Sequence, residues 1–166
     1  QEMIKGGQTR RISLDNYKYD IPHFIRSDAF IPKADLVQTT ADYSLEKFNL
    51  DYYADPDNST SKDMVYHDDG NTPNTYQKGQ YEILHLSSEQ NSQDQLAIEL
   101  KKEIGANFSS KLKMIGQLKM HNMVDKPSSI FINNKKQKYN YDPTDHQLII
   151  KNIQLNKKKT EIIIKF

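Results

Sequence analysis

Cysteine and tryptophan are both missing from the 166 residues of this chain. Without cysteine, a disulfide framework and any thiolate metal site are excluded. No apolar run approaches the roughly 20 residues that a membrane-spanning helix needs. The charged, apolar and small-residue succession of a signal peptide is not found in the first residues. Because the chain starts at Gln1 and soon enters Gly6 and Gly7, we expect it to be cut from something longer.

The chain nevertheless has enough bulk for a hydrophobic core. Hydrophobic residues make up 36% of it, and they include ten tyrosines and six phenylalanines. A chain of this length forms one domain, or one domain plus a fragment of another. The composition therefore fits a thin, aromatic-rich core.

The net charge of +1 hides a strong asymmetry along the chain. Residues 1–100 carry 9 basic and 17 acidic side chains, whereas residues 101–166 carry 14 and 5. A basic half raises the question of nucleic-acid binding. The lysines, however, are spread along predicted strands instead of gathering on one helix, so we predict solvated strand faces that pair with the acidic half, and no nucleic-acid partner. The lysines concerned are Lys111, Lys113, Lys119, Lys136 and Lys138.

A repeat of two residues dominates the hydrophobic pattern. Within residues 112–120 the even positions are apolar apart from Gly116, which predicts a strand. A glycine in mid-strand indicates a bulge or a close backbone approach. Residues 45–53 and 81–86, rich in Tyr, Phe, Ile and Leu, predict further strands. Residues 96–104 fit both helical spacing and alternation, and the surrounding strands favour a strand there.

The last forty residues show the clearest strand and turn signals. Ile130 and Ile132 form a short strand before a turn at Asn133 and Asn134, since Asn tolerates positive φ. We expect Tyr139 and Tyr141 to alternate in the return strand. Residues 142–145, Asp-Pro-Thr-Asp, predict a turn before a strand at residues 148–150.

A final strand carries Ile162, Ile164 and Phe166 on one face, whereas the polar stretches at residues 54–63 and 87–95 are predicted loops. Many short strands separated by turns predict an all-β, antiparallel β-sandwich.

Two acidic motifs invite functional interpretations. Asp68 and Asp69 resemble a glycosidase carboxylate pair, but adjacent residues of an extended segment point to opposite faces, and Gly70 follows them. We therefore predict a turn in which these side chains bind local backbone amides. The Asp-x-Asp-x-Ser at residues 55–59 begins like a calcium loop, but Thr60 and Tyr66 stand where an EF-hand needs Gly and Glu. A looser calcium site there stays open.

Other chemistry is weakly signalled. The five histidines have no ligand spacing, so no metal site is predicted. No GxSxG, phosphate-binding or dinucleotide-binding loop occurs, and we predict no catalytic residue and no cofactor. Tyrosine rings could stack on sugars through their apolar faces, although packing within the sheets is the commoner role. The tyrosines considered are Tyr52, Tyr53, Tyr76, Tyr81, Tyr139 and Tyr141.

Residues 19–32, YDIPHFIRSDAFIP, resemble the signature that follows the catalytic barrel in glycoside hydrolase family 31. Asp28 stands where that family usually has Gly, so the local turn could differ. Upstream, Gly-Gly-Gln-Thr at residues 6–9 looks like the strand entry before the signature. Residues 65–70 with 76–81 resemble the family's Y-E-D-D-G…Y-x-x-G-x-Y hairpin, with His67 in place of Glu. Residues 130–150 resemble its closing hairpin, with Asn134 where Gly is frequent.

The resemblance implies an architecture in two parts. Residues 1–35 would be the final strands of the proximal C-terminal β-domain, and residues 36–166 the distal β-sandwich. The family's catalytic aspartates lie in the barrel, which would precede Gln1, and no position here matches their motifs. The chain would thus not hydrolyse glycosides alone, and its partners would be the parent enzyme's barrel and proximal β-domain. The polar, Lys- and Asn-rich sequence suggests a bacterial protein in the periplasm or outside the cell.

Two functions follow as hypotheses. The first is a non-catalytic accessory domain that stabilises or orients the barrel of a family 31 α-glycosidase, with α-glucosidase as the expected activity of the parent. The alternative is a carbohydrate-binding module that retains α-linked oligo- or polysaccharide on two or three exposed aromatic side chains. Candidates for such a platform are Tyr52, Tyr53, Tyr76 and Tyr141.

Overall fold

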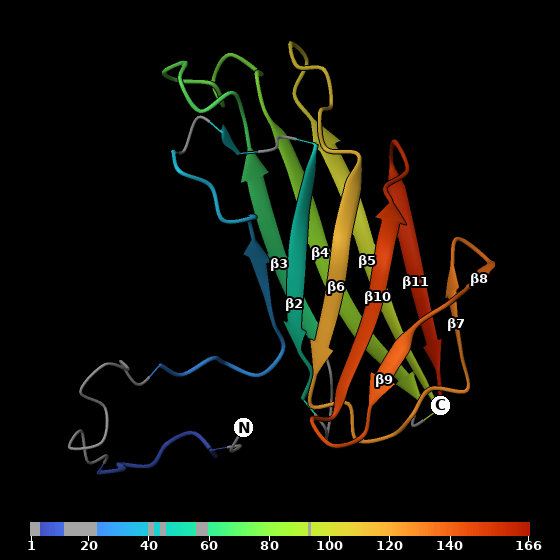
Figure 1. Cartoon of the computed structure of the whole chain (residues 1–166). Helices are drawn as coiled ribbons and strands as arrows, with labels where there is room; N and C mark the ends of the chain where they lie inside the picture. The colour runs from blue at the N-terminus through green and yellow to red at the C-terminus, as the bar shows by residue number, and fades with distance from the viewer. Residues whose placement is uncertain (1–3, 12–22, 40–41, 44–45, 56–59, 93) are drawn as a thin grey trace.

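Two β-sheets stacked face to face form the body of the protein (Figure 1). The computed structural model describes residues 4–11, 23–39, 42–43, 46–55, 60–92 and 94–166. The strands are β1 (Ala29–Lys33), β2 (Lys47–Tyr53), β3 (Thr60–His67), β4 (Glu82–Ser92), β5 (Gln95–Ile104), β6 (Met114–His121), β7 (Ser129–Ile132), β8 (Lys135–Gln137), β9 (Asn140–Asp142), β10 (Gln147–Gln154) and β11 (Lys159–Lys165).

The sheets have five and six strands. The first has the order β1-β2-β6-β10-β9 and the second β3-β4-β5-β11-β7-β8. Among the described strand pairs, β2 and β6 run parallel, and the other pairs are antiparallel. The predicted all-β sandwich is confirmed. Within the described residues, no helix is long and apolar enough to cross a bilayer.

The core lies between the sheets and is built by alternating side chains. Leu96, Ile98 and Leu100 of β5 point inward and are at most 3% exposed, and Ile162 and Ile164 of β11 are fully buried beside them. Each such side chain contributes about 1.5–3 kcal/mol when it leaves water. The alternation confirms the strand interpretation for residues 96–104, the segment that also had helical spacing.

A bulge at Gly116 changes the phase of β6. Phe48 pairs with Ile115 but Leu50 pairs with Leu118, so β6 advances one residue more than β2. This register shift confirms the bulge, one of the two alternatives predicted for Gly116. A Cβ on Gly116 would lie 2.8 Å from Oδ1 of the Asn49 side chain. The strand predicted over residues 112–120 is confirmed from Met114 onward, and its alternation has the opposite phase before the bulge, where Ile115 is fully buried and Met114 is partly exposed.

Polar residues 87–92 lie in a strand, which corrects the loop prediction for residues 87–95. They belong to β4, where residues 87–89 pair with both β3 and β5, and Gln90 and Ser92 continue the pairing with β5. Backbone hydrogen bonds to the neighbouring strands outweigh the weak strand propensity of Ser and Gln in this part of β4. Ser88 is only 3% exposed and its Oγ lies 2.8 Å from the buried Tyr52 hydroxyl. Similarly, Thr60 begins β3, so the loop predicted over residues 54–63 ends earlier.

The C-terminal turns form as predicted, but the return strand is divided between the sheets. Asn133 and Asn134 have φ of 49° and 65° between β7 and β8, as a two-residue hairpin turn requires. β8 pairs with β7 in the six-stranded sheet, whereas β9, which contains Tyr141, pairs with β10 in the other sheet. Tyr139 lies on the crossing between them, so the prediction of one continuous return strand was wrong.

The turn at residues 142–145 is confirmed by Asp142 Oδ1, which accepts a hydrogen bond from Thr144 N at 2.8 Å.

β1 joins the sandwich and is anchored by the turn before it. It pairs with β2 along its whole length, while residues 12–22, which include the first four residues of the family 31 signature, lie outside the described residues. Asp28 has φ of 60°, a conformation in which Gly is most easily accommodated. Its carboxylate accepts hydrogen bonds from Tyr52 Oη at 2.9 Å and from Asp55 N at 3.2 Å. The carboxylate thus holds the turn against β2, and a domain boundary near residue 35 stays a prediction.

Candidate functional site

Four of the tyrosines considered for sugar stacking are used by the fold. Tyr52 is fully buried, and the ring of Tyr53 stacks on His121 with centroids 4.2 Å apart. The hydroxyl of Tyr139 donates to Pro127 O, and that of Tyr141 donates to Val124 O at 2.8 Å. These residues join strands and loops together and do not form a common platform.

Three tyrosines stack at one end of the six-stranded sheet. Tyr81 lies between Tyr66 and Tyr76, with ring centroids 6.0 and 4.8 Å away and interplanar angles of 19° and 28°. Tyr66 is 44% and Tyr76 57% exposed. We call these three side chains the tyrosine stack. Tyr76 and Tyr81 were among the predicted candidates, whereas Tyr66 was not.

Tyr76 lies in the loop at residues 68–81, and hydrogen bonds to two acidic residues, Asp68 and Asp69, stabilise this loop. Asp68 Oδ1 accepts from Gly70 N at 2.8 Å, and Asp69 Oδ1 accepts from Thr72 N at 2.9 Å. Hydrogen bonds from the Thr72 hydroxyl and nearby backbone amides lower the pKa of Asp69 to about 2. The bond from the Thr75 hydroxyl, followed by that from Gly70 N, lowers the pKa of Asp68. The turn interpretation of the acidic pair is confirmed, because both carboxylates bind their own loop.

Threonine 75 connects this loop to the stack. Its hydroxyl donates to Asp68 Oδ2 at 2.6 Å and lies 2.7 Å from the Tyr66 hydroxyl. Thr75 is itself only 6% exposed. The Tyr66 ring is therefore fixed at its hydroxyl end by a buried neighbour.

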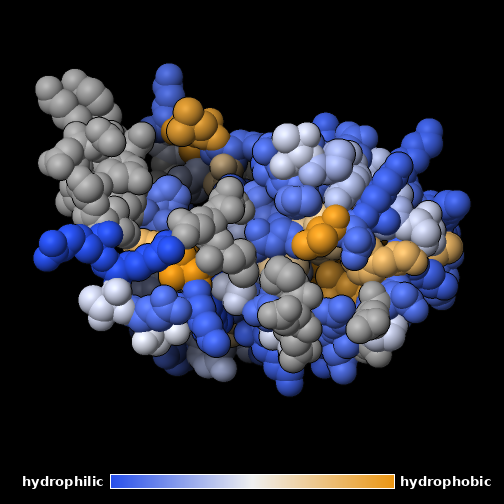
Figure 2. Space-filling model, turned by 90° about the horizontal axis from the view of Figure 1, so that it is seen from below, coloured by the Kyte–Doolittle hydropathy of each residue, from blue (hydrophilic) through white to orange (hydrophobic). Residues whose placement is uncertain are grey.

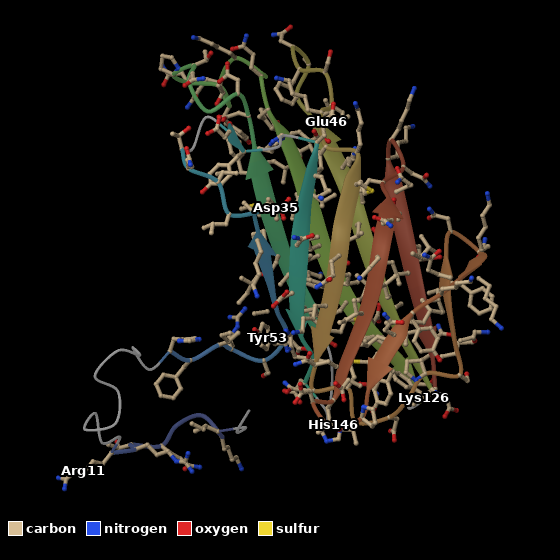
Figure 3. All side chains as sticks on the ribbon, viewed as in Figure 1. Arg11, Asp35, Glu46, Tyr53, Lys126 and His146 are labelled. Atoms are coloured by element: carbon tan, nitrogen blue, oxygen red, sulfur yellow. The ribbon has the colours of Figure 1, made fainter. Side chains whose placement is uncertain are left out.

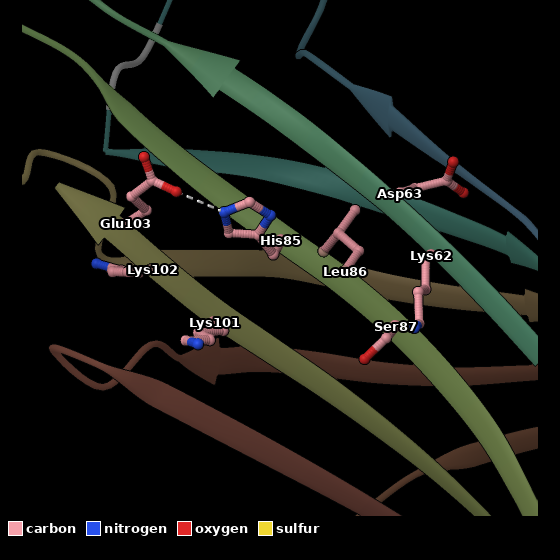
Figure 4. A pocket seen from close by; sticks show the side chains of 8 residues that line it. All are labelled: Lys62, Asp63, His85, Leu86, Ser87, Lys101, Lys102 and Glu103. Carbon is pink, nitrogen blue, oxygen red and sulfur yellow. Dashed lines mark hydrogen bonds and ion pairs between the residues drawn. The ribbon is translucent and has the colours of Figure 1, made fainter. Parts of the chain in front are cut away.

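A shallow groove of about 450 Å³ lies on the outer face of β3, β4 and β5 (Figure 4). His85 Nε2 and Glu103 Oε2 are 2.9 Å apart in it, and Tyr81 Oη donates to Glu103 Oε1 at 2.9 Å. Hydrogen bonding from His85, and then from Tyr81, lowers the pKa of Glu103. The groove is lined by Lys62, Asp63, His85, Leu86, Ser87, Lys101, Lys102 and Glu103.

Strand register places the tyrosine stack and the groove on one surface. Tyr66 is opposite Ile83, and Ile83 is opposite Glu103. The next pair of residues on the same face of β3 and β4 is Met64 and His85. Directly opposed residues point to the same side of a sheet. The aromatic stack and the His85–Glu103 pair are thus neighbours on the exposed face of the six-stranded sheet, which we call the tyrosine face.

The carboxylates that are most deeply buried are engaged in the fold. Glu82 is fully buried, with Lys102 Nζ at 3.3 Å, and it accepts from Ser110 Oγ at 2.6 Å. Asp51 is 3% exposed and lies between Lys33 Nζ at 2.5 Å and His121 Nε2 at 3.1 Å. These contacts hold loops and strand edges, so neither carboxylate is presented to a substrate.

In the part of the chain that the structure describes, no group of three or more His, Asp or Glu side chains could hold a metal. Asp57 and Ser59 of the considered calcium motif lie outside the described residues, whereas the Asp55 carboxylate accepts a hydrogen bond from Ser27 Oγ at 3.2 Å.

Three described lysines of the basic half pair with the acidic half, and one of them, Lys113, is among the five lysines for which such pairing was predicted. Lys113 Nζ lies 2.6 Å from Glu46, which precedes β2 (Figure 3). Lys159 Nζ lies 2.6 Å from Glu99, and Lys102 pairs with the buried Glu82. The two halves of the sequence are thus joined electrostatically within the sandwich.

Burial favours the neutral imidazole of two histidines, the buried His121 and the partly buried His67, and makes the fold sensitive to acid. Burial lowers the pKa of His67 and of His121 below 6.5. The unfolded chain therefore binds more protons near and below that pH. The stabilising contribution of these neutral side chains is complete above pH 6.5 and decreases as the pH falls toward their folded-state pKa values.

Urea unfolding is expected to show lower stability at about pH 5.5 than at about pH 7.5. Replacing both His67 and His121 with Gln should flatten this dependence. His146→Asn is the control, because His146 is exposed and its φ of 50° suits Asn. An unchanged pH dependence in the double variant would show that these two histidines are not responsible.

The sequence matches no protein-family model and no curated protein sequence. Among solved structures, a GH31 dextranase from Flavobacterium johnsoniae is similar over 86% of this chain and 19% of its own, with a TM-score of 0.69 and 16% identity. The chain has the fold of a β-sandwich region of GH31 enzymes. The predicted resemblance to glycoside hydrolase family 31 is therefore confirmed at the level of fold.

A second solved structure is also similar to this GH31-like sandwich. The cycloalternan-forming enzyme from Listeria monocytogenes, solved with a pentasaccharide substrate, matches 84% of this chain and 13% of its own. Its TM-score is 0.52 and its identity 13%. The chain thus spans less than a fifth of the length of either neighbour, and at these identities the likeness establishes the fold alone.

Proposed function

We propose that this chain is a non-catalytic accessory β-sandwich of a larger GH31 α-glycosidase. The observation that carries the proposal is the similarity over 86% of this chain to a fifth or less of a GH31 dextranase. Catalysis would then belong to a barrel elsewhere in the polypeptide, with α-glucosidase as the expected activity. Residues 1–35 would complete a proximal β-domain and residues 36–166 would form the distal one, in a bacterial periplasmic or extracellular enzyme.

Exposed apolar side chains around β1 support a covered surface in the parent enzyme. Phe24 is 67% exposed, and Ile25 is 38% exposed. Leu36, just after β1, is completely exposed. Figure 2 shows apolar residues in orange among hydrophilic ones on the face that it views. Apolar side chains of this size near one strand are typical of segments that pack against a neighbouring domain.

The test of the accessory role compares the complete enzyme with a version that lacks residues 36–166. We expect deletion to shorten the half-life of thermal inactivation several-fold, because the apolar surface of the parent loses its cover. The kcat per folded molecule on a nitrophenyl α-glucoside should stay the same. Equal half-lives with and without the sandwich would contradict a stabilising role.

A second candidate function is retention of α-linked oligo- or polysaccharide. It is favoured by the tyrosine face, where exposed aromatic rings and hydrogen-bonding side chains lie together. Carbohydrate binding and support of a barrel are compatible, since they use different surfaces of the chain.

A further inference from the structure

We propose that the tyrosine face binds a neutral, α-linked gluco-oligosaccharide along the outer side of β3, β4 and β5, with one pyranose ring against the tyrosine stack. The α-linked glucose class rests on the second function proposed above. The site itself rests on the rings and polar groups that the fold brings together.

The stack offers ring surface that is already fixed in place. Tyr81 is held between the other two rings, and its hydroxyl is bonded to Glu103 at 2.9 Å. The Tyr66 hydroxyl is bonded to Thr75 at 2.7 Å. Rings that are immobile before binding lose little conformational freedom when a ligand arrives. Tyr66 and Tyr76 each stack on Tyr81 and are 44% and 57% exposed, so part of each side chain stays accessible to a ligand.

The groove beside the stack supplies partners for sugar hydroxyls. A hydroxyl group both donates and accepts, so it suits a surface that mixes the two kinds of group. Glu103 accepts, Lys62 and Lys101 donate, and the Ser87 hydroxyl can do both. Glu103 partly offsets the positive charge of the two exposed lysines on this face, which favours a ligand without a strong negative charge.

The exposed Met64 next to the stack also fits a ligand-binding surface. It is 67% exposed on β3, between Lys62 and Tyr66, and is directly opposite His85. Because the Met64 side chain is flexible, its thioether can pack against the apolar face of a sugar ring even when the position of that ring varies. The face thus carries an apolar strip flanked by polar groups, which is the pattern of small-molecule sites.

The alternative role of the stack is to fasten the loop at residues 68–81 to the sheet. The two roles differ in how they respond to Tyr76→Ala. If the stack only holds the loop, Tyr76→Ala loosens the attachment of the loop to the sheet. Any sugar binding elsewhere on the protein is then unchanged. If it forms the site, the change removes an exposed ring face that the sugar contacts.

The experiment is an amide chemical-shift titration of the chain with isomaltotriose, maltotriose and, as a comparison, cellotriose. We expect Kd values in the millimolar range for the α-linked sugars, with shifts confined to β3, β4, β5 and the loop at residues 68–81. Tyr76→Ala and Tyr66→Ala should each raise Kd about tenfold. Glu103→Gln, which preserves shape, should raise it several-fold. Tyr43→Ala is the matched control, because Tyr43 is 45% exposed and belongs neither to the tyrosine stack nor to the groove lining.

The outcomes separate the site from the function. Binding that is unchanged in Tyr76→Ala and Tyr66→Ala, with both variants folded by their amide spectra, would overturn the proposed site while leaving carbohydrate retention in place. The absence of shifts with all three sugars at millimolar concentration would overturn carbohydrate retention itself. Equal affinity for cellotriose would overturn the α-linked class. None of these results bears on the accessory role.

Discussion

Replacing Glu82 with alanine is expected to lower the free energy of unfolding by about 3–5 kcal/mol. Glu82 is fully buried and accepts hydrogen bonds from Ser110 Oγ at 2.6 Å and Leu112 N at 3.3 Å. Its removal leaves the ammonium group of Lys102, whose side chain is 5% exposed, without its buried counter-charge. An uncompensated buried charge is among the costliest changes that a fold can undergo.

Urea unfolding followed by tyrosine fluorescence measures this loss. Glu161→Ala is the matched control, because Glu161 forms an ion pair with Lys159 on the same sheet but is 42% exposed in its side chain, and it should change stability little. The double change Glu82→Met with Lys102→Met should recover part of the stability, since it removes both charges together. If Glu82→Ala were no more harmful than Glu161→Ala, the buried pair would not hold the loop at residues 108–112.

Gly105→Ala is expected to destabilise the protein by about 1–3 kcal/mol and to disturb the tyrosine stack. A Cβ at this position would lie 2.4 Å from Gly79 O and 2.7 Å from Gly79 C, both backbone atoms that side-chain rotation cannot move. Gly105 N donates to Tyr81 O at 2.9 Å, so any separation of the two loops displaces Tyr81.

Gly116→Ala provides the comparison for Gly105→Ala. Its added Cβ would also make a contact of 2.8 Å, but with the side-chain Oδ1 of Asn49, and its next contacts are with carbon atoms of the flexible Lys47 side chain. These neighbours can rotate away, so the loss of stability should be clearly smaller. The two variants should be compared by urea unfolding and by the amide shifts of Tyr66, Tyr76 and Tyr81. Equal effects at both positions would contradict the close approach of the two loops.

Hydrophobic alternation predicted the sandwich because buried strand faces require it. The alternating residues of β5 and β11 are apolar and face the core, and the turns at Asn133–Asn134 and at residues 142–145 follow from local φ preferences and Asx hydrogen bonds. The errors arose where pairing with distant strands decides the outcome. The polar end of β4 is a strand because β5 pairs with it to Ser92 and β3 pairs with it as far as Glu89. The phase of β6 changes because of the bulge between β6 and β2 at Gly116.

The candidate site was predicted only in part. Tyr76 and Tyr81 were recognised as aromatic candidates, but Tyr52 and Tyr141 looked equivalent to them in the sequence. Which tyrosines are exposed depends on register, which places Tyr66 opposite Ile83 on the outer face. The spacing of two residues between Met64 and Tyr66 was the sequence signal that could have placed both side chains on one face of a strand. No short-range pattern could pair His85 with Glu103, because they come from different strands.

The size of the native polypeptide that contains this sequence tests the central claim most directly. Cells that produce the protein should be analysed by gel separation, with an antibody against the sandwich and peptide mass fingerprinting of the detected band. We predict a polypeptide several times longer than this 19.3 kDa chain, with peptides from a catalytic barrel in the same band. A stable native species of 19.3 kDa, with no longer form, would contradict the assignment to a larger GH31 glycosidase.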